Sequence, residues 1–340
     1  MKDSPIDVLG IGNAIVDILA PVDEAFLARH AMAKGGMAIV DEARAHLIYA
    51  DMPAGVEASG GSAANTIAGV ASFGGRTAFI GKVKDDEFGR IFQHDLASQG
   101  VLFRTEPAHD GPATARCLVL VTADAQRTMN THLGACIDLG PDDVEPVLVA
   151  GSAIVYLEGY LFDPPHAKAA FRKAATIARE AGRKVALSLS DSFCVQRYRT
   201  EFRDLVADHV DILFANEAEL RELCGHDDIG EAANYLAANA EIAAVTLGAK
   251  GSLIISGDQR IHLPAAPVET LVDTTGAGDL YASGVLFGLS QNMPLAECGW
   301  LGSLAAAEVI SHYGARPHAR LDRLAKDAVT SRRLSAGTRH

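Results

Sequence analysis

The sequence predicts an α/β fold in which a mostly parallel sheet is covered by helices on both faces. From about residue 140 onward, short apolar runs alternate with helical patterns, which is typical of βαβ units. Two regions, 14–42 and 109–135, break this alternation with short strand-like pieces and little helix, and we expect them to pair as a small projecting sheet. The alternative is that both are surface loops, although loops of this length are uncommon.

The expected strands are the apolar β-rich runs, and the expected helices are the segments between them with apolar residues at helical spacing. We expect strands at 6–11, 77–80, 117–121, 153–157, 185–189, 212–214, 243–247 and 253–255. We expect helices at 63–73, 87–98, 165–181, 217–223, 231–238, 278–289 and 295–311. The large domain would then comprise 1–13, 43–108 and 136–330, and we expect the polar tail at 331–340 to be disordered.

Length, composition and charge exclude several classes of protein. The 340 residues, 49% of them hydrophobic, suffice for two domains or for one large α/β domain with an insertion. The net charge of -13 argues against a nucleic-acid partner, which would require a basic face. The five cysteines form no CxxC pair, which favours a reduced, cytoplasmic protein. We expect no membrane association, because the sequence shows neither a signal peptide nor a long apolar run.

One segment near the C-terminus, 273–279, combines an anion-binding turn with an acid. Its sequence is DTTGAGD, and Gly276, Ala277 and Gly278 precede or open a predicted helix, whose free N–H groups and dipole favour a phosphate. Asp279 would repel that phosphate unless it accepts a proton from a hydroxyl that attacks the phosphate. The alternative is an acid that only stabilises the helix N-terminus.

Two further glycine segments lie in the N-terminal part of the chain. The first, 10–12, lacks the third glycine of a dinucleotide fingerprint, and the chain contains no P-loop motif. Asn13 and Asp17 follow the first strand, where an open α/β sheet binds ligands, so they could hold sugar hydroxyls or cap a turn. The second, 60–75, places Asn65 in the first turn of a helix, where it could hold a polar ligand or permit close packing.

Two further motifs follow predicted strands in the second half of the chain. Asn216 and Glu219 have the spacing of a capping box, or Glu219 could order water around Mg²⁺ with Asn216 near phosphates. Thr246, Gly248 and Gly251 belong either to a plain hairpin or to a turn that carries a nucleotide.

Taken together, these segments resemble the PfkB, or ribokinase-like, family of carbohydrate and nucleoside kinases. The family pattern D-T-x-G-A-G-D matches 273–279 at every fixed position, and the N-terminal glycine signature matches 60–75. The N-x-x-E motif matches Asn216 and Glu219, and T-x-G-x-x-G matches 246–251. The motifs occur in the family's order, and the resemblance covers nearly the whole chain except its tail.

Within this family the chain is most similar to the adenosine kinase branch. The segment 12–18, GNAIVDI, resembles a motif whose final aspartate binds ribose hydroxyls, and 60–65, GGSAAN, resembles the branch's G-G-S-x-x-N. The resemblance implies a large α/β domain with a small β lid. It also implies that ATP and Mg²⁺ are used to phosphorylate the 5′-hydroxyl of a nucleoside, adenosine above all, giving AMP in purine salvage.

The resemblance assigns roles to individual residues. Asp279 would accept the proton, while the N–H groups of Gly276, Ala277 and Gly278 would stabilise charge on the transferred group. The nucleoside would be held by a set that ends with a base-stacking aromatic, for which Phe162 is an alternative: Asn13, Asp17, Gly61, Ser62, Asn65 and Tyr160. The nucleotide would be held by Asn216, Thr246, Gly248, Gly251, Thr275 and Ser303, with Glu219 reaching Mg²⁺ through water.

Several alternatives remain open from the sequence. Arg127 in the expected lid would close over the phosphates, or it is an ordinary surface arginine. The acceptor could be a sugar such as ribose or fructose, or another nucleoside. A non-catalytic nucleoside-binding regulator is also conceivable, although such a protein gains nothing from Asp279 beside a phosphate site. The oligomeric state is not predicted.

Overall fold

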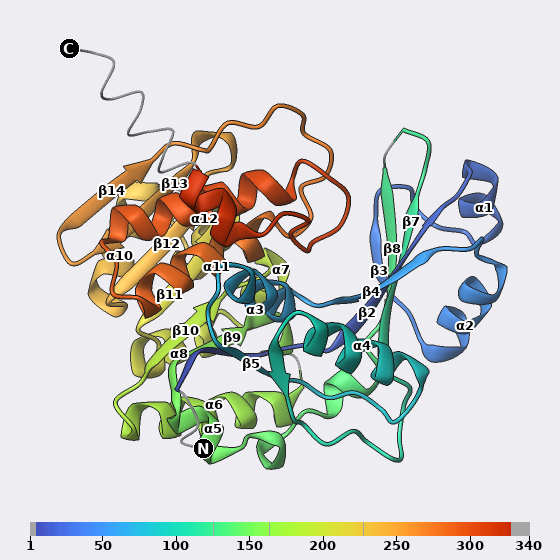
Figure 1. Cartoon of the computed structure of the whole chain (residues 1–340), viewed down its shortest axis with the longest axis horizontal. Coiled ribbons are helices and arrows are strands. Elements are labelled where there is room, and N and C mark those ends of the chain that lie inside the picture. The colour runs from blue at the N-terminus through green and yellow to red at the C-terminus, as the bar shows by residue number, and fades with distance from the viewer. Residues whose placement is uncertain (1–4, 125, 163, 227, 328–340) are drawn as a thin grey trace.

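The fold consists of two sheets of unequal size, joined side by side (Figure 1). The structure is a computed structural model that describes residues 5–124, 126–162, 164–226 and 228–327. The larger sheet carries helices on both faces and the smaller one projects beside it, which confirms the predicted ribokinase-like architecture. The predicted disordered tail, 331–340, lies outside the described residues.

The larger sheet has nine strands in the order β14-β13-β12-β11-β10-β9-β1-β5-β6. All neighbouring strands are parallel except that β13 runs antiparallel to both β12 and β14. The strands are β1 (Ile6–Ile11), β5 (Thr77–Ile80), β6 (Val101–Phe103), β9 (Ser152–Glu158), β10 (Lys184–Ser188), β11 (Ile212–Asn216), β12 (Ile242–Thr246), β13 (Ser252–Ser256) and β14 (Gln259–Leu263).

Helices cover both faces of this sheet because consecutive strand residues point to opposite sides. In β1, Val8 joins the core beneath one layer and Leu9 joins the core beneath the other. The first layer is α3 (Ser62–Ser72), α4 (Glu87–Ser98), α11 (Ala277–Ser290) and α12 (Leu295–Val309). The second is α5 (Pro146–Ala150), α6 (Pro165–Glu180), α7 (Ser192–Arg197), α8 (Arg199–His209), α9 (Glu217–Cys224) and α10 (Ile229–Asn239).

The smaller sheet, with the helices beside it, forms the lid. Its strand order is β3-β8-β7-β2-β4. The lid comprises β2 (Ile15–Pro21), α1 (Glu24–Arg29), β3 (Met37–Ile39), α2 (Glu42–Asp51), β4 (Val56–Gly60), β7 (Ala115–Val121) and β8 (Arg127–His132). The sequence predicted strands in 14–42 and 109–135, but it predicted none of α1, α2 and β4. It also placed residues 43–108, which contain β4 and most of α2, in the large domain. Because β4 is short and its first residues are exposed, it lacks the apolar run that marks a strand.

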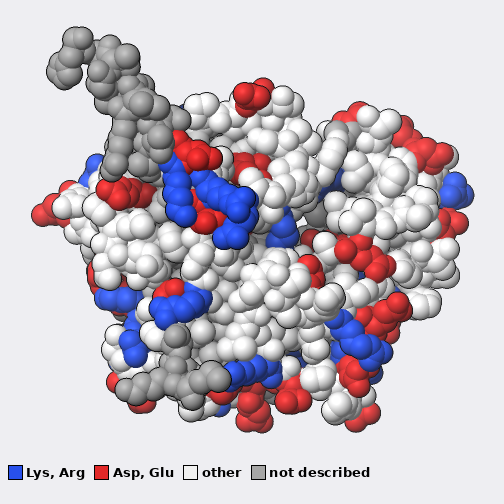
Figure 2. Space-filling model, viewed as in Figure 1, with Lys and Arg blue, Asp and Glu red and all other residues white. Residues whose placement is uncertain are grey.

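The lid is attached at the edge of the large sheet where the parallel strands end. The chain enters the lid directly after β1 and leaves it from β4 into α3, through Gly60 and Gly61. Short 3₁₀ helices follow β8 and β9 and form the tip of the β12–β13 hairpin: Gly134–Asp138, Pro141–Asp143, Gly159–Phe162 and Gly248–Lys250. Charges of both signs are dispersed over the face seen in Figure 2.

Candidate active site

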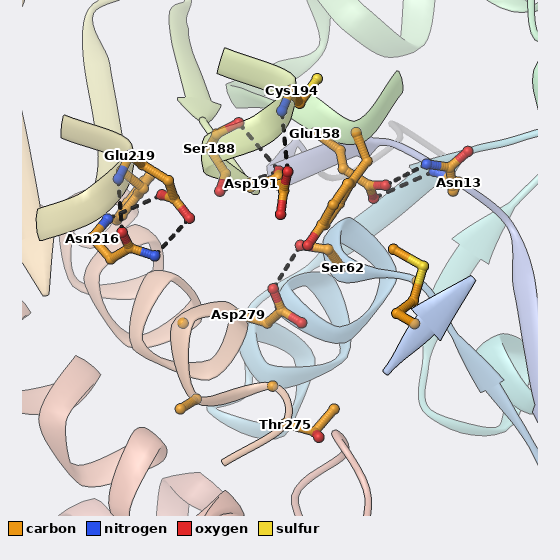
Figure 3. Close-up of a pocket in the computed structure, with 18 of the residues that line it drawn as sticks. Asn13, Ser62, Glu158, Ser188, Asp191, Cys194, Asn216, Glu219, Thr275 and Asp279 are labelled. Carbon is orange, nitrogen blue, oxygen red and sulfur yellow. Dashed lines mark hydrogen bonds between the residues drawn. The ribbon is translucent and has the colours of Figure 1, made fainter. Parts of the chain in front are cut away.

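A cavity of about 760 Å³ lies where the central parallel strands end, between the large sheet and the lid. This is the edge at which open α/β sheets bind ligands. Figure 3 shows side chains from several elements converging on it. Most residues predicted from the sequence line it, namely Asn13, Asp17, Gly61, Ser62, Tyr160, Asn216, Glu219, Thr246, Thr275, Gly276, Ala277, Gly278 and Asp279.

Asp279 is held by the first turn of α3. Its Oδ1 accepts a hydrogen bond from Ser62 Oγ at 2.6 Å, and its Oδ2 accepts one from Asn65 Nδ2 at 2.9 Å. Burial raises the pKa of this carboxyl, while the two hydrogen bonds and the charge of Arg316 oppose the rise. The hydrogen bonds fix the orientation of the carboxylate beside the start of α11, as Figure 3 shows for Ser62.

The turn before α11 has the geometry of an anion site. Gly276 adopts a left-handed conformation with φ of 77°, and a Cβ there would lie 2.8 Å from that of Ala315. A Cβ on Gly278 would meet nothing within 4 Å, so the helix start is open on that side. Since the first N–H groups of a helix have no partner within it, this turn can present donors and a positive dipole to a phosphate.

Asp273 organises the same turn from behind. Its Oδ1 accepts from the backbone N–H of Thr275 at 3.1 Å and from the Thr275 hydroxyl at 2.9 Å. Its Oδ2 accepts from the backbone N–H of Gly314 at 3.2 Å. The first aspartate of the motif therefore shapes the loop, a role for which the sequence offered no assignment.

Arg127 connects the lid to this turn. Its Nη2 lies 2.5 Å from Asp273 Oδ2, its Nη1 donates to Thr275 Oγ1 at 3.0 Å, and its guanidinium lies over the Tyr313 ring. Only 12% of its side chain is exposed, so the alternative of an ordinary surface arginine is wrong. In this conformation Arg127, the first residue of β8, joins the lid to the turn before α11.

Glu158 is a site residue that sequence reasoning missed. Its Oε2 accepts from the backbone N–H groups of Ala63 at 2.8 Å and Asn13 at 3.3 Å, and its Oε1 accepts from Asn13 Nδ2 at 2.6 Å. Burial raises the pKa of Glu158 to about 7. Glu158 is the last residue of β9, and a polar residue at a strand end was the signal that could have identified it. Asp191, which caps α7 at the same edge, was missed as well.

Asp17 enters the cavity from the lid strand β2. Burial raises the pKa of its carboxyl to about 6, although the charges of Arg316 and Arg127 oppose that rise. A Cβ on Gly60, the last residue of β4, would lie 2.3 Å from Asp17 Oδ2. The glycine therefore leaves the room that this carboxylate needs.

Asn216 and Glu219 form the predicted capping box at the start of α9. Asn216 Oδ1 accepts from the Glu219 N–H at 2.9 Å, and the Glu219 carboxyl accepts from the Asn216 N–H at 3.0 Å and from its Nδ2 at 2.7 Å. Burial raises the pKa of Glu219 to about 7. Because both oxygens are already hydrogen-bonded, the arrangement suits contact with Mg²⁺ through water better than direct ligation.

Five predicted residues lie outside the cavity lining. Arg127 and Asn65 lie behind it, bonded to lining residues. Gly248 and Gly251 form the tip of the β12–β13 hairpin, and a hairpin was one of the two alternatives predicted for this segment. Ser303 is buried in α12, where its hydroxyl donates to Pro264 O at 3.5 Å. Among the described residues, no cluster of three or more His, Cys, Asp or Glu could hold a metal ion.

Comparison with known proteins assigns this chain to a family. The pfkB family carbohydrate kinase model matches residues 43–320. This chain belongs to the pfkB family. It is a phosphotransferase with an alcohol group as acceptor, and family members use ATP, generally with Mg²⁺. Among the described residues, every helix is too short or too polar to span a bilayer.

Two solved structures cover nearly the whole chain. An adenosine kinase from Sinorhizobium meliloti is 51% identical, with a TM-score of 0.88 over 96% of this chain and 99% of that one. A probable sugar kinase from Rhizobium etli CFN 42 is 49% identical, with a TM-score of 0.89 over the same shares. Fructokinase-1 from Oryza sativa subsp. japonica is 30% identical over 70% of this chain and 75% of its own length.

Proposed function

We propose that this pfkB-family kinase transfers the γ-phosphoryl group of ATP to the 5′-hydroxyl of a nucleoside, with adenosine the favoured acceptor and AMP the product. The observation that carries the proposal is Asp279, held by two donors from α3 beside an open helix N-terminus. The 51% identity to an adenosine kinase supports the choice of acceptor.

The chemistry follows from where these groups lie. The acceptor oxygen forms a bond to the γ-phosphorus as the bond from that phosphorus to the bridging oxygen of ADP breaks. Asp279 takes the hydroxyl proton, and the N–H groups of Gly276 and Gly278 face the charge on the transferred group. The N–H of Ala277, which was also assigned to this charge, donates to the carbonyl oxygen of Thr274 at 3.2 Å. Bound Mg²⁺ would neutralise phosphate charge, with Glu219 oriented toward its water shell.

The ribose would be held at the junction of the large sheet and the lid. Asp17 projects from β2, and Asn13 follows β1 with its Nδ2 already committed to Glu158. The amide oxygen of Asn13 and the Asp17 carboxylate are then the acceptors for ribose hydroxyls, beside Gly61 and Ser62. Asn65, which lies behind the lining, supports this site through its hydrogen bond to Asp279.

The base would lie between two apolar walls of the cavity. On the lid side, Met37 and Ile39 line the cavity with exposed fractions of 56% and 59%, and Met129 lies beside them. The large-sheet side contributes Tyr160 and Phe193, which are also exposed large side chains. Exposed apolar and aromatic groups on both walls favour a flat aromatic base over a small polyhydroxylated sugar.

The nucleotide would extend from the anion site along the other end of the cavity. Asn216, Thr246, the hairpin at Gly248 and Gly251, Thr275 and Ser303 are the residues that we assign to it. We infer that lid closure moves Arg127 from Asp273 onto the phosphates and excludes water that would otherwise hydrolyse ATP.

A sugar acceptor is the second candidate. The 49% identity to a probable sugar kinase favours it, and the cavity lining includes Ser188, Ser190 and Asp191, which could hold sugar hydroxyls.

The test is ADP release by the purified chain with Mg²⁺-ATP and a panel of adenosine, inosine, guanosine, cytidine, ribose and fructose. We expect kcat/KM for adenosine to exceed that for either sugar by at least about 10²-fold, because the sugars leave the apolar walls unburied. A higher kcat/KM for fructose or ribose would overturn the nucleoside assignment. Absence of ADP release with every acceptor would overturn the kinase assignment in favour of a binding protein.

A further inference from the structure

Arg316 is a partly buried arginine that the proposed mechanism does not use. Arg316 follows α12 in the chain, and its guanidinium donates three hydrogen bonds. Nε donates to the carbonyl oxygen of Ser59 at 3.1 Å, Nη2 donates to the hydroxyl of Ser59 at 2.9 Å, and Nη1 donates to the carbonyl oxygen of Ala64. Its partners precede it by about 250 residues in the chain.

These partners lie on either side of the junction between the lid and the large sheet. Ser59 belongs to the lid strand β4, whereas Ala64 lies in the first turn of α3. Only Gly60 to Ala63 separate them, and Gly61 takes a φ of 92°. Because the same turn of α3 supplies both donors to Asp279, the hydrogen bonds of Arg316 fix the turn that orients the carboxylate.

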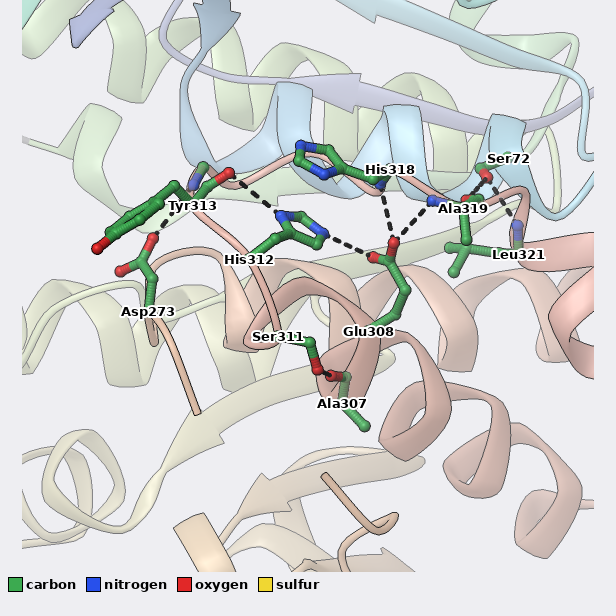
Figure 4. Close-up of polar contacts among 11 residues, drawn as sticks. Ser72, Asp273, Ala307, Glu308, Ser311, His312, Tyr313, His318, Ala319 and Leu321 are labelled. Atoms are coloured by element: carbon green, nitrogen blue, oxygen red, sulfur yellow. Dashed lines mark hydrogen bonds and ion pairs between the residues drawn. The ribbon is translucent and has the colours of Figure 1, made fainter. Parts of the chain in front are cut away.

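The segment that carries Arg316 is itself anchored, as Figure 4 shows. Upstream, the backbone N–H of Gly314 donates to Asp273 in the anion-site loop. Downstream, Glu308 of α12 accepts from the backbone N–H groups of His318 at 2.9 Å and Ala319 at 2.7 Å. Arg316 is therefore held in place from both sides, and its segment also contacts the anion site.

The charge of Arg316 lies among carboxyl groups from three elements. Burial lowers the pKa of Arg316 to about 10, while Asp95 on α4, Asp17 on β2 and Asp279 on α11 oppose that change. Ser59 connects the first of these directly, since its N–H donates to Asp95 at 2.8 Å. The positive charge of the guanidinium thus lowers the pKa of two carboxylates of the proposed site, Asp17 and Asp279.

We propose that Arg316 is a positioning residue for phosphoryl transfer, which clamps the β4–α3 junction and thereby sets the position and charge of Asp279. The proposal rests on the proposed kinase function for its catalytic meaning. Its structural part is the clamp on the β4–α3 junction, which does not depend on whether the protein turns over a substrate. Two measurements test these parts separately.

The first measurement is hydrogen exchange of the backbone amides of residues 56–66 in Arg316→Met, Arg316→Lys and wild type. We expect faster exchange there in Arg316→Met and an intermediate rate in Arg316→Lys. The control is Arg90→Met on α4, which removes an exposed ion pair with Asp85. Exchange in either Arg316 variant equal to wild type would overturn the clamp, whatever the enzyme phosphorylates.

The second measurement is the pH dependence of kcat by ADP release. In Arg316→Met we expect kcat to fall by roughly 10- to 100-fold while KM for ATP changes little, because a displaced base loses its near-attack geometry. The acidic limb should also move to higher pH, because Asp279, which already faces the carboxyls of Asp17, Glu158 and Glu219, loses its opposing cation.

Arg316→Lys keeps the charge but not the planar set of donors. We expect its acidic limb to remain at the wild-type position while kcat recovers only in part, an outcome that a purely structural role would not produce. If Arg316→Met does not fold, wild-type kcat in Arg316→Lys overturns the proposal. An inactive wild type would refute the kinase function and leave the exchange measurement to decide on the clamp.

Discussion

In the large sheet, β1 and β5 are buried on both faces, whereas β3 in the lid is exposed along its whole length. The residues that we assign to chemistry are Asp279 and the turn before it. They belong to the large domain, where α3 donates two hydrogen bonds to Asp279 at the start of α11. The residues that we assign to base selection include exposed lid side chains, Met37 and Ile39. The difference indicates that the proposed chemistry depends on a buried scaffold, whereas the proposed acceptor choice depends on exposed side chains of the lid.

The strongest test of this division is Asp279→Asn, in the large domain. We expect kcat to fall by about 10²- to 10⁴-fold, because the amide cannot accept the hydroxyl proton. Adenosine affinity by calorimetry should change little, since Asp17 and the apolar walls remain. The control is Asp258→Asn at an exposed turn between β13 and β14. A kcat within tenfold of wild type would remove Asp279 from its role.

Removing core from the large sheet should affect stability rather than acceptor choice. Phe171 on α6 is fully buried beneath the sheet. We expect Phe171→Ala to lower the free energy of unfolding by about 3–5 kcal/mol in urea titrations, because it leaves a cavity. The KM for adenosine should stay near wild type in the folded fraction. A loss below about 1 kcal/mol would contradict the picture of a tightly packed scaffold.

The opposite result is expected on the lid. The double variant Met37→Ser, Ile39→Ser should raise the KM for adenosine roughly tenfold, because two side chains no longer bury apolar area against the base. Its kcat and free energy of unfolding should change little, as both side chains are more than half exposed. Leu47→Ser, an exposed position on α2 outside the cavity, is the matched control. An unchanged KM in the double variant would exclude this wall from base recognition.

The smallest effect concerns Asp17, where the lid meets the sheet. Its pKa of about 6 is above the ordinary value of 3.8, so the carboxylate becomes protonated as pH falls through about 6. If the charged form binds the ribose hydroxyls, KM for adenosine should rise as pH falls, roughly fourfold at pH 5.5. Asp17→Asn should show a higher KM without this pH dependence. A wild-type KM that is flat from pH 8 to 5.5 would contradict the role.

Most strands of the large sheet could be predicted from the sequence because they are buried on both faces and form continuous apolar runs. The edge strands β6 and β14 are less buried and were missed. The expected bounds 6–11, 77–80 and 87–98 coincide with β1, β5 and α4. In the lid, β4, α1 and α2 were missed, since most of their residues are exposed and they carry no such run.

The candidate site divides in the same way. Asp279, Asn216 and Asp17 follow or begin elements in short motifs, so local sequence suffices to find them. Glu158 and Arg316 were missed because their roles depend on partners far away in the chain, such as Asn13, 145 residues from Glu158. Only the folded topology brings such groups together.

The central claim is that one cavity places an acceptor hydroxyl at Asp279 and its base against the exposed lid face. A crystal structure with adenosine and a non-hydrolysable ATP analogue tests it most directly. We predict that the 5′-oxygen lies within hydrogen-bond distance of the Asp279 carboxylate, with the base between Met37 or Ile39 and Tyr160 or Phe193. A base bound elsewhere, or a 5′-oxygen directed away from Asp279, would contradict the account.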